Sequence, residues 1–227
     1  MKKIGMIVAV EIDAVLSRYG MPAEEESFGS YRMSRYDTEN YTLYVMHSGA
    51  GEIAAAACTQ LLISVYHVDF ILNFGVVGGL TEEMEKCRSC IIEKVVHYDF
   101  DCSEIDGTRV GQYLELPDEY IPVSKELFDR ARQIAPELKP VVCASGDKFV
   151  ADPEVKKALH RKYGADICEM EAAAVSLTCY RNHVPCLLIK TVSDGIRGGA
   201  QEFQKELQRT SGICLEIADR VIREAAR

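Results

Sequence analysis

The sequence lacks the features that would place the protein in a membrane, outside the cell or on a nucleic acid. No stretch approaches the roughly 18 apolar residues that span a bilayer. The apolar run 4–10 is short and meets Glu11, so it does not look like the core of a signal peptide. No basic cluster is present and the formal net charge is −9, which disfavours binding to phosphate backbones. We therefore expect a cytoplasmic protein with neither a membrane nor a nucleic-acid partner.

A disulfide framework is not expected either, although the chain has nine cysteines. Their number is odd and they are scattered through apolar segments, so we interpret most of them as small buried residues in a reducing compartment. Cys87 and Cys90 form a C-x-x-C pair, which could be redox-active or half a zinc site. No second pair or His pair at ligand spacing accompanies it. We interpret the pair as two incidental thiols.

Short apolar runs alternate with amphipathic stretches along the whole chain, which is typical of α/β proteins. The apolar runs are mostly continuous, as expected for strands covered on both faces. The segment 98–121 follows neither period and is predicted to be a long loop. A chain of 227 residues allows one or two domains, and because the alternation never breaks we expect one, over 1–227. The expected strands are 3–10, 42–47, 69–76, 90–97, 140–145 and 186–193, and the expected helices are 12–19, 52–66, 125–133, 153–163, 169–182 and 201–226.

Glycine-rich turns follow two of these strands. The segment 49–54 matches the dinucleotide fingerprint G-x-G-x-x-A, but Asp69 precedes the next strand, whereas the ribose-binding acid should end it. We therefore interpret Ser48 and Gly49 as part of a tight turn beside a ligand, without a nicotinamide cofactor. The segment 73–79 contains three glycines, and Gly78 there is either a plain turn residue or part of a crevice at the carboxyl ends of the strands.

Acidic residues also gather where predicted strands end. Glu11 and Asp13 follow the first strand, Glu169 and Glu171 begin a predicted helix, and Asp194 ends a strongly apolar strand. Each has an ordinary explanation as a first-turn or turn residue. An Asp that leaves a buried strand is also a candidate general acid, because a low-dielectric environment raises its pKa. Together these residues predict a crevice lined with carboxylates, suited to a neutral or cationic substrate.

Taken in order, six segments resemble the nucleoside phosphorylase superfamily, most closely the methylthioadenosine/S-adenosylhomocysteine nucleosidases. They are M-K-K-I-G-M-I-V-A-V-E-I-D, H-S-G-A-G-E-I-A-A-A, N-F-G-V-V-G-G-L, S-G-D-K-F-V, C-E-M-E-A-A-A-V and V-S-D-G. The resemblance implies a three-layer α/β/α sandwich around a mixed, partly barrel-like central sheet. It implies hydrolysis of the N-glycosidic bond of a purine nucleoside without a metal or an organic cofactor. It also implies a homodimer in which the loop 98–121 of one subunit completes the neighbouring site.

The resemblance assigns roles to individual residues. Asp194 matches the acid that protonates N7 of the purine, and Ser193 would orient it. Glu171 matches the carboxylate that holds the ribose hydroxyls. Asp13 matches, by its spacing from the first strand, the acid that positions the attacking water, and Glu11 is the alternative. The other expected substrate contacts are Met170 on the sugar, Phe149 and Val150 at the base, Phe203 at the 5′ group, and Glu169, Ser48, Gly49, Val76 and Gly78 around them.

Several positions depart from the family pattern. Asp13 is one methylene shorter than the usual glutamate, and Val76 stands where a small hydroxyl residue is common. Glu52 replaces a basic residue, and Lys190 stands where an arginine is common. These differences leave the 5′ substituent open: it could be hydroxyl, methylthio or homocysteinyl.

Two further functions stay open at this point. A phosphorylase of this superfamily needs arginines around its phosphate, and the glycine turns have none nearby, although Arg109 or Arg197 could reach the site. Glu52 would repel an anion, which favours water as the nucleophile. The departures at Asp13 and Val76 motivate the second alternative, a catalytically weak protein that binds nucleosides without cleaving them.

Overall fold

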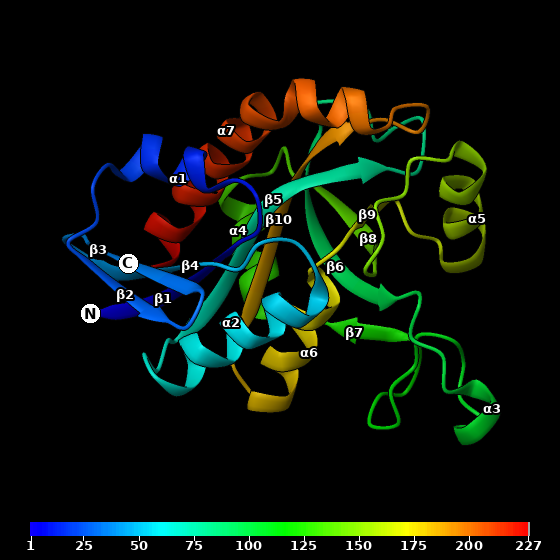
Figure 1. Ribbon diagram of the computed structural model, residues 1–227, viewed down its shortest axis with the longest axis horizontal. Helices are drawn as coiled ribbons and strands as arrows, with labels where there is room; N and C mark the ends of the chain where they lie inside the picture. The colour runs from blue at the N-terminus through cyan, green and yellow to red at the C-terminus, as the bar shows by residue number, and fades with distance from the viewer. Residues whose placement is uncertain (227) are drawn as a thin grey trace.

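The structure is a computed structural model that describes residues 1–226. Figure 1 shows helices on both faces of a central sheet, and residues 1–226 place ten strands in that sheet. The strands are β1 (Lys2–Val8), β2 (Glu24–Phe28), β3 (Tyr31–Asp37), β4 (Tyr41–His47), β5 (Phe70–Gly79), β6 (Ser89–His97), β7 (Tyr120–Pro122), β8 (Lys139–Ser145), β9 (Ile167–Glu169) and β10 (Cys186–Asp194). The helices are α1 (Ile12–Tyr19), α2 (Glu52–Ser64), α3 (Ser103–Asp106), α4 (Lys125–Ile134), α5 (Pro153–Tyr163), α6 (Ala172–Asn182) and α7 (Ala200–Ala225).

The sheet is mixed and partly closed on itself. Its strand order is β10-β6-β8-β9-β5-β1-β4-β3-β2, and β10 also pairs with β5, so that five strands form a ring. The neighbours β4, β1, β5 and β10 are parallel, whereas β10 and β6 are antiparallel. The carboxyl ends of β1, β5 and β10 therefore meet at one edge. The expected mixed, partly barrel-like sheet is confirmed.

Both faces of the sheet are covered, which explains the continuous apolar runs. On β1, Met6 and Val8 pack in the same cluster as Cys214 and Leu215 of α7. Ile7 points to the other face, into a cluster that includes α2 and α6. Figure 1 shows the same division, with α1 and α7 on one side of the strands and α2 and α6 on the other. The predicted three-layer α/β/α arrangement is confirmed.

The predicted strands and helices are found close to their expected bounds, with a few differences. β2 and β3 were not predicted: β2 reads Glu-Glu-Glu-Ser-Phe and is mostly exposed at the edge of the sheet, so it has no apolar period. The expected loop 98–121 contains the short helix α3 and the first two residues of β7. Glu169 ends a strand, and α6 begins at Ala172 with Glu171 as its N-cap, so the predicted helix start at residue 169 is wrong.

Two other sequence features have simple counterparts in the structure. All nine cysteines are free thiols, and Cys90 of the C-x-x-C pair is buried in β6. Within residues 1–226, no helix has the length and apolar character that crossing a membrane requires.

Candidate active site

A cavity lies where the carboxyl ends of β1, β5 and β10 meet the start of α6 and α7. It has a volume of about 90 Å³. The parallel pairing of the three strands brings Glu11, Val76 and Asp194 into its wall, although they are far apart in the sequence. Of the residues predicted for the site, those that line it are Glu11, Val76, Gly78, Phe149, Glu169, Met170, Glu171, Ser193, Asp194 and Phe203.

Asp194 is a buried carboxyl at one end of this cavity. Its side chain is 1% exposed, and its Oδ2 accepts a 2.7 Å hydrogen bond from Nζ of Lys156 on α5. Its Oδ1 lies 3.0 Å from the hydroxyl of Ser193, which is also buried. Burial raises the pKa of Asp194, and the ammonium of Lys156 opposes that rise. The carboxyl is therefore oriented through both oxygens and has a perturbed ionisation.

Lys156 was not predicted from the sequence. Its side chain is fully buried, on the same face of α5 as Leu159 and Tyr163. A lysine on the apolar face of an amphipathic helix is the sequence signal that marks it, because a buried lysine needs a partner. The spacing alone does not show which acid that partner is.

Glu11 lies in the cavity wall and its carboxylate is fixed by the backbone. Its Oε1 accepts a 2.9 Å hydrogen bond from the Val76 amide, and its Oε2 accepts one of the same length from the Val10 amide. The carboxylate also packs directly against Gly75, where an added Cβ would lie 2.7 Å from Oε1. A glycine is therefore required at position 75 for Glu11 to adopt this place.

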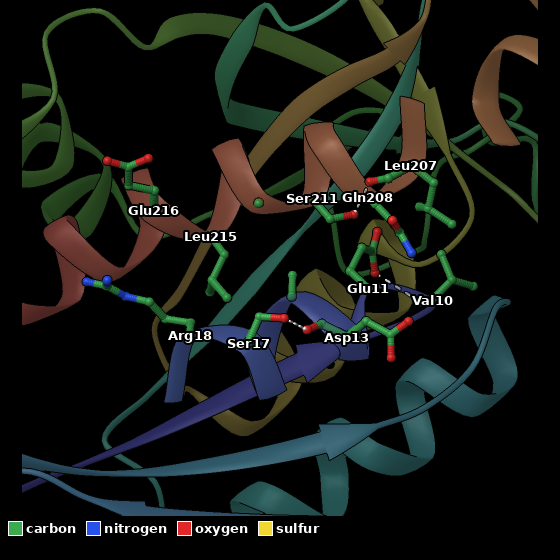
Figure 2. A pocket seen from close by; sticks show the side chains of 12 residues that line it. Val10, Glu11, Asp13, Ser17, Arg18, Leu207, Gln208, Ser211, Leu215 and Glu216 are labelled. Atoms are coloured by element: carbon green, nitrogen blue, oxygen red, sulfur yellow. Dashed lines mark hydrogen bonds between the residues drawn. The ribbon is translucent and has the colours of Figure 1, made fainter. Parts of the chain in front are cut away.

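Asp13 lies elsewhere. Its side chain is exposed and lines a larger cavity, of about 510 Å³, between α1 and α7. Figure 2 shows the Glu11 side chain pointing toward α7, whereas the Asp13 side chain points away from it. Only Val10 and Glu11 line both cavities. Because the larger cavity includes neither Asp194 nor Glu171, we place the chemistry in the smaller one, and of the two alternatives for the water-positioning acid the geometry favours Glu11.

Further carboxyl groups surround Lys190 behind the cavity. Lys190 is buried and its Nζ lies 3.1 Å from Oε2 of Glu169, whose carboxylate also accepts hydrogen bonds from the first amides of α6. Glu171 accepts a 2.8 Å bond from the Gly51 amide, and burial beside Glu169 raises its pKa to about 8. The Glu52 carboxyl accepts a hydrogen bond from the Ser145 hydroxyl, and burial raises the pKa of Glu52 to about 8 as well. Glu52 and Glu171 are therefore mostly protonated at neutral pH.

Two aromatic rings border the cavity on its open side. Phe149 and Phe203 meet edge to face, with centroids 5.5 Å apart, and Phe149 is 42% exposed. Val150 is buried beside them and lines a separate small cavity together with Asp194. Ser48 and Gly49 do not line either cavity: the Ser48 hydroxyl bonds the Val8 carbonyl, and Gly49 takes a positive φ in the turn before α2. Phe149 thus has an open face at the cavity mouth.

The family model described as "Phosphorylase superfamily" matches residues 3–223. The chain belongs to this superfamily. It is 32% identical to a 5′-methylthioadenosine/S-adenosylhomocysteine nucleosidase of Hydrogenovibrio crunogenus over 200 residues, 85% of each chain. It is 30% identical to an aminodeoxyfutalosine nucleosidase of Helicobacter pylori strain J99 over 226 residues, which cover 95% of this chain and 97% of the relative. The resemblance seen in the six sequence segments is confirmed.

Solved structures extend the likeness to the fold. A crystal structure of the Helicobacter pylori 5′-methylthioadenosine/S-adenosylhomocysteine nucleosidase, complexed with a substituted pyrrolidin-3-ol, superposes with a TM-score of 0.92 at 28% identity, over 98% of each chain. The native futalosine hydrolase of Helicobacter pylori strain 26695 gives the same TM-score at 27% identity, again over 98% of each chain. The fold is therefore that of the nucleosidases in this superfamily.

Proposed function

We propose that the protein hydrolyses the N-glycosidic bond of an adenosine derivative with a 5′ substituent and releases the free base. The observation that carries this function is the placement of Asp194, Glu11 and Glu171 around one buried cavity. The relatives described above act on such nucleosides by name, and the reaction needs an acid for the base and negative charge near the sugar. The protein is, on this account, a hydrolase of N-glycosidic bonds.

The first task is to make the purine a good leaving group. An anionic purine leaves poorly, and a proton delivered to N7 neutralises it as the bond breaks. Asp194 carries that proton, because it is a buried carboxyl with a raised pKa whose two oxygens are oriented by Lys156 and Ser193. A positioned general acid contributes roughly 10²–10⁴-fold. Phe149 holds the base by stacking on its open face.

The second task is to stabilise the sugar, which becomes cationic at C1′ as the bond lengthens. Glu11 supplies negative charge, as carboxylates do in other glycoside hydrolyses. Glu171 binds the ribose hydroxyls, and Glu11 orients the attacking water and accepts its proton. The two backbone amides bonded to Glu11 fix the direction from which the water approaches. Fixed geometry of this kind lowers the entropic cost of the attack.

Water is a better nucleophile for this cavity than phosphate. No arginine lines it within the described chain, and Lys190 behind it is already paired with Glu169. Neither Arg109 nor Arg197 lines the cavity of its own subunit: each is exposed and paired with a glutamate. These contacts support hydrolysis and disfavour the phosphorylase alternative.

Release of free base tests the function. Methylthioadenosine, S-adenosylhomocysteine, aminodeoxyfutalosine and inosine are each incubated with the protein in phosphate-free buffer, and adenine or hypoxanthine is measured by chromatography. We expect release from at least one adenosine derivative, and a loss of 100-fold or more in the Asp194→Asn variant. Thermal stabilisation by these nucleosides without any release would support the alternative of a binding protein and contradict the hydrolase.

We further propose that the active protein is a cytoplasmic homodimer of single-domain subunits that works in nucleoside catabolism, including methionine salvage. The loop 98–121 carries two exposed apolar side chains, Ile105 at 86% and Leu114 at 71%, which a partner subunit would cover. In this arrangement the loop completes the neighbouring site. A monomeric mass in light scattering together with full activity would contradict the dimer.

A further inference from the structure

A second buried charge accompanies the proposed general acid. The Lys156 side chain is 0% exposed and Asp194 is 1% exposed, so both charged groups of this pair are removed from solvent. The three hydrogens of the ammonium have three acceptors: Asp194 Oδ2 at 2.7 Å, the Gly195 carbonyl at 2.8 Å and the Gly198 carbonyl at 3.2 Å. Lys156 therefore has no donor left for a substrate. Whatever it contributes to the reaction must act through Asp194 and the turn 195–198.

Few other charges face Asp194. Ser193 on β10 bonds the Asp194 carboxyl, and the uncharged Cys168 on β9 lies beside it. Gly78 of β5 has no side chain and so leaves room for the ion pair of Lys156 and Asp194. On α7, Glu202 accepts a hydrogen bond from the Gly195 amide and is itself paired with Lys86. Lys156 is thus the one cation in the described chain that bonds the Asp194 carboxyl directly.

We propose that Lys156 is the positioning residue for Asp194: its ammonium fixes the direction of the carboxyl and sets the pH range in which Asp194 holds the proton for the purine. This inference rests on the proposed function for its kinetic consequence, although the pairing can be tested without turnover. Burial without a paired cation would raise the pKa of Asp194 further and make it a weaker acid that gives up its proton less readily. The nearby ammonium stabilises the carboxylate left after the transfer, so the proton is given up more readily.

The direction of the effect follows from the charges. Burial raises the pKa of Asp194 and Lys156 provides the largest opposing contribution. An opposite charge within hydrogen-bond distance shifts a carboxyl pKa by about 1–3 units. Removing the ammonium therefore raises the pKa of Asp194, and a general acid with a raised pKa keeps its proton to higher pH. The alkaline fall of kcat/KM should move to higher pH by at least one unit, while kcat at neutral pH falls because the weaker acid donates less readily.

The test compares Lys156→Met with Lys157→Met. Lys157 is the next residue on α5, is exposed and pairs only with Glu154, so its variant controls for the loss of one charge on the same helix. We measure kcat/KM for release of adenine from pH 5 to pH 10. In parallel, carbon-13 NMR of labelled aspartate carboxyls follows the ionisation of Asp194, with the resonance assigned through Asp194→Asn. A raised Asp194 pKa and a shifted alkaline limb in Lys156→Met alone support the proposal.

A second variant covers the case in which Lys156→Met does not fold. Lys156→Gln keeps a hydrogen-bond donor toward the turn 195–198 but loses the charge, and the same shift is expected from it. If wild-type protein releases no base, the hydrolase function is wrong, while the NMR titration still decides the role of Lys156. Lower activity with an unchanged alkaline limb and an unchanged Asp194 pKa, in either variant, would show that Lys156 only supports the fold and would overturn the proposal.

Discussion

Gly75 offers a sharp test of the role of Glu11, because this glycine packs against the Glu11 carboxylate without lining the cavity itself. A Cβ added at position 75 would lie 2.7 Å from Glu11 Oε1, whereas ordinary contacts begin near 3.4 Å. In Gly75→Ala the carboxylate must therefore retreat by about 0.7 Å or rotate, and it loses its bond to the Val76 amide. A misplacement of about 1 Å in a catalytic group costs on the order of 10²-fold in rate.

We therefore expect kcat for base release to fall 30- to 100-fold, on the order given by such misplacements, in Gly75→Ala. Gly212→Ala is the matched control: it lies in α7, nothing lies within 4 Å of its added Cβ, and alanine is the better helix former. Circular dichroism and thermal melting show whether each variant is folded. Full activity in a folded Gly75→Ala variant would refute the role given to the Glu11 carboxylate.

The remaining predictions concern four side chains of the site. Glu11→Gln should lose 100-fold or more in kcat, whereas Asp13→Asn should stay within about twofold of wild type; the reverse order would return the role to Asp13. Because Glu52 keeps its proton up to about pH 8 in the folded state but loses it near 4.5 when unfolded, stability should fall as pH rises between these values. Glu52→Gln should flatten that decline in melting temperature, and an unchanged slope would contradict the raised pKa. Phe149→Ala should raise KM about two- to tenfold, as expected for roughly 0.5–1.5 kcal/mol of stacking, and an unchanged KM would place the base elsewhere.

Much of the fold was predictable because its strands are buried on both faces. β10 is buried at every position and begins with the apolar run 186–189, which lacks the alternation of buried and exposed positions of a surface helix. The hairpin of β2 and β3 has no such signal. Its outer strand begins with three glutamates at the sheet edge, and it is held by backbone pairing to β3, which composition does not reveal.

The site was predictable in its outline but not in its detail. The spacing after the first strand favoured Asp13 and left Glu11 as the alternative. In the structure Glu11 is the N-cap of α1 and its carboxylate packs against Gly75. Ser48 and Gly49 do not line the cavity, and the Ser48 hydroxyl is bonded to the carbonyls of Val8 and Gly49. Lys156 was missed because its partner is 38 residues away on another element. In each case the deciding fact is a contact between segments distant in sequence.

The identity of the sugar product decides whether water or phosphate attacks the sugar. Methylthioadenosine is incubated with the protein in phosphate buffer at neutral pH, and the sugar is identified by mass spectrometry and phosphorus-31 NMR. If water is the nucleophile, adenine appears together with methylthioribose, in the same yield as without phosphate. Formation of methylthioribose 1-phosphate, or release that requires phosphate, would contradict the account.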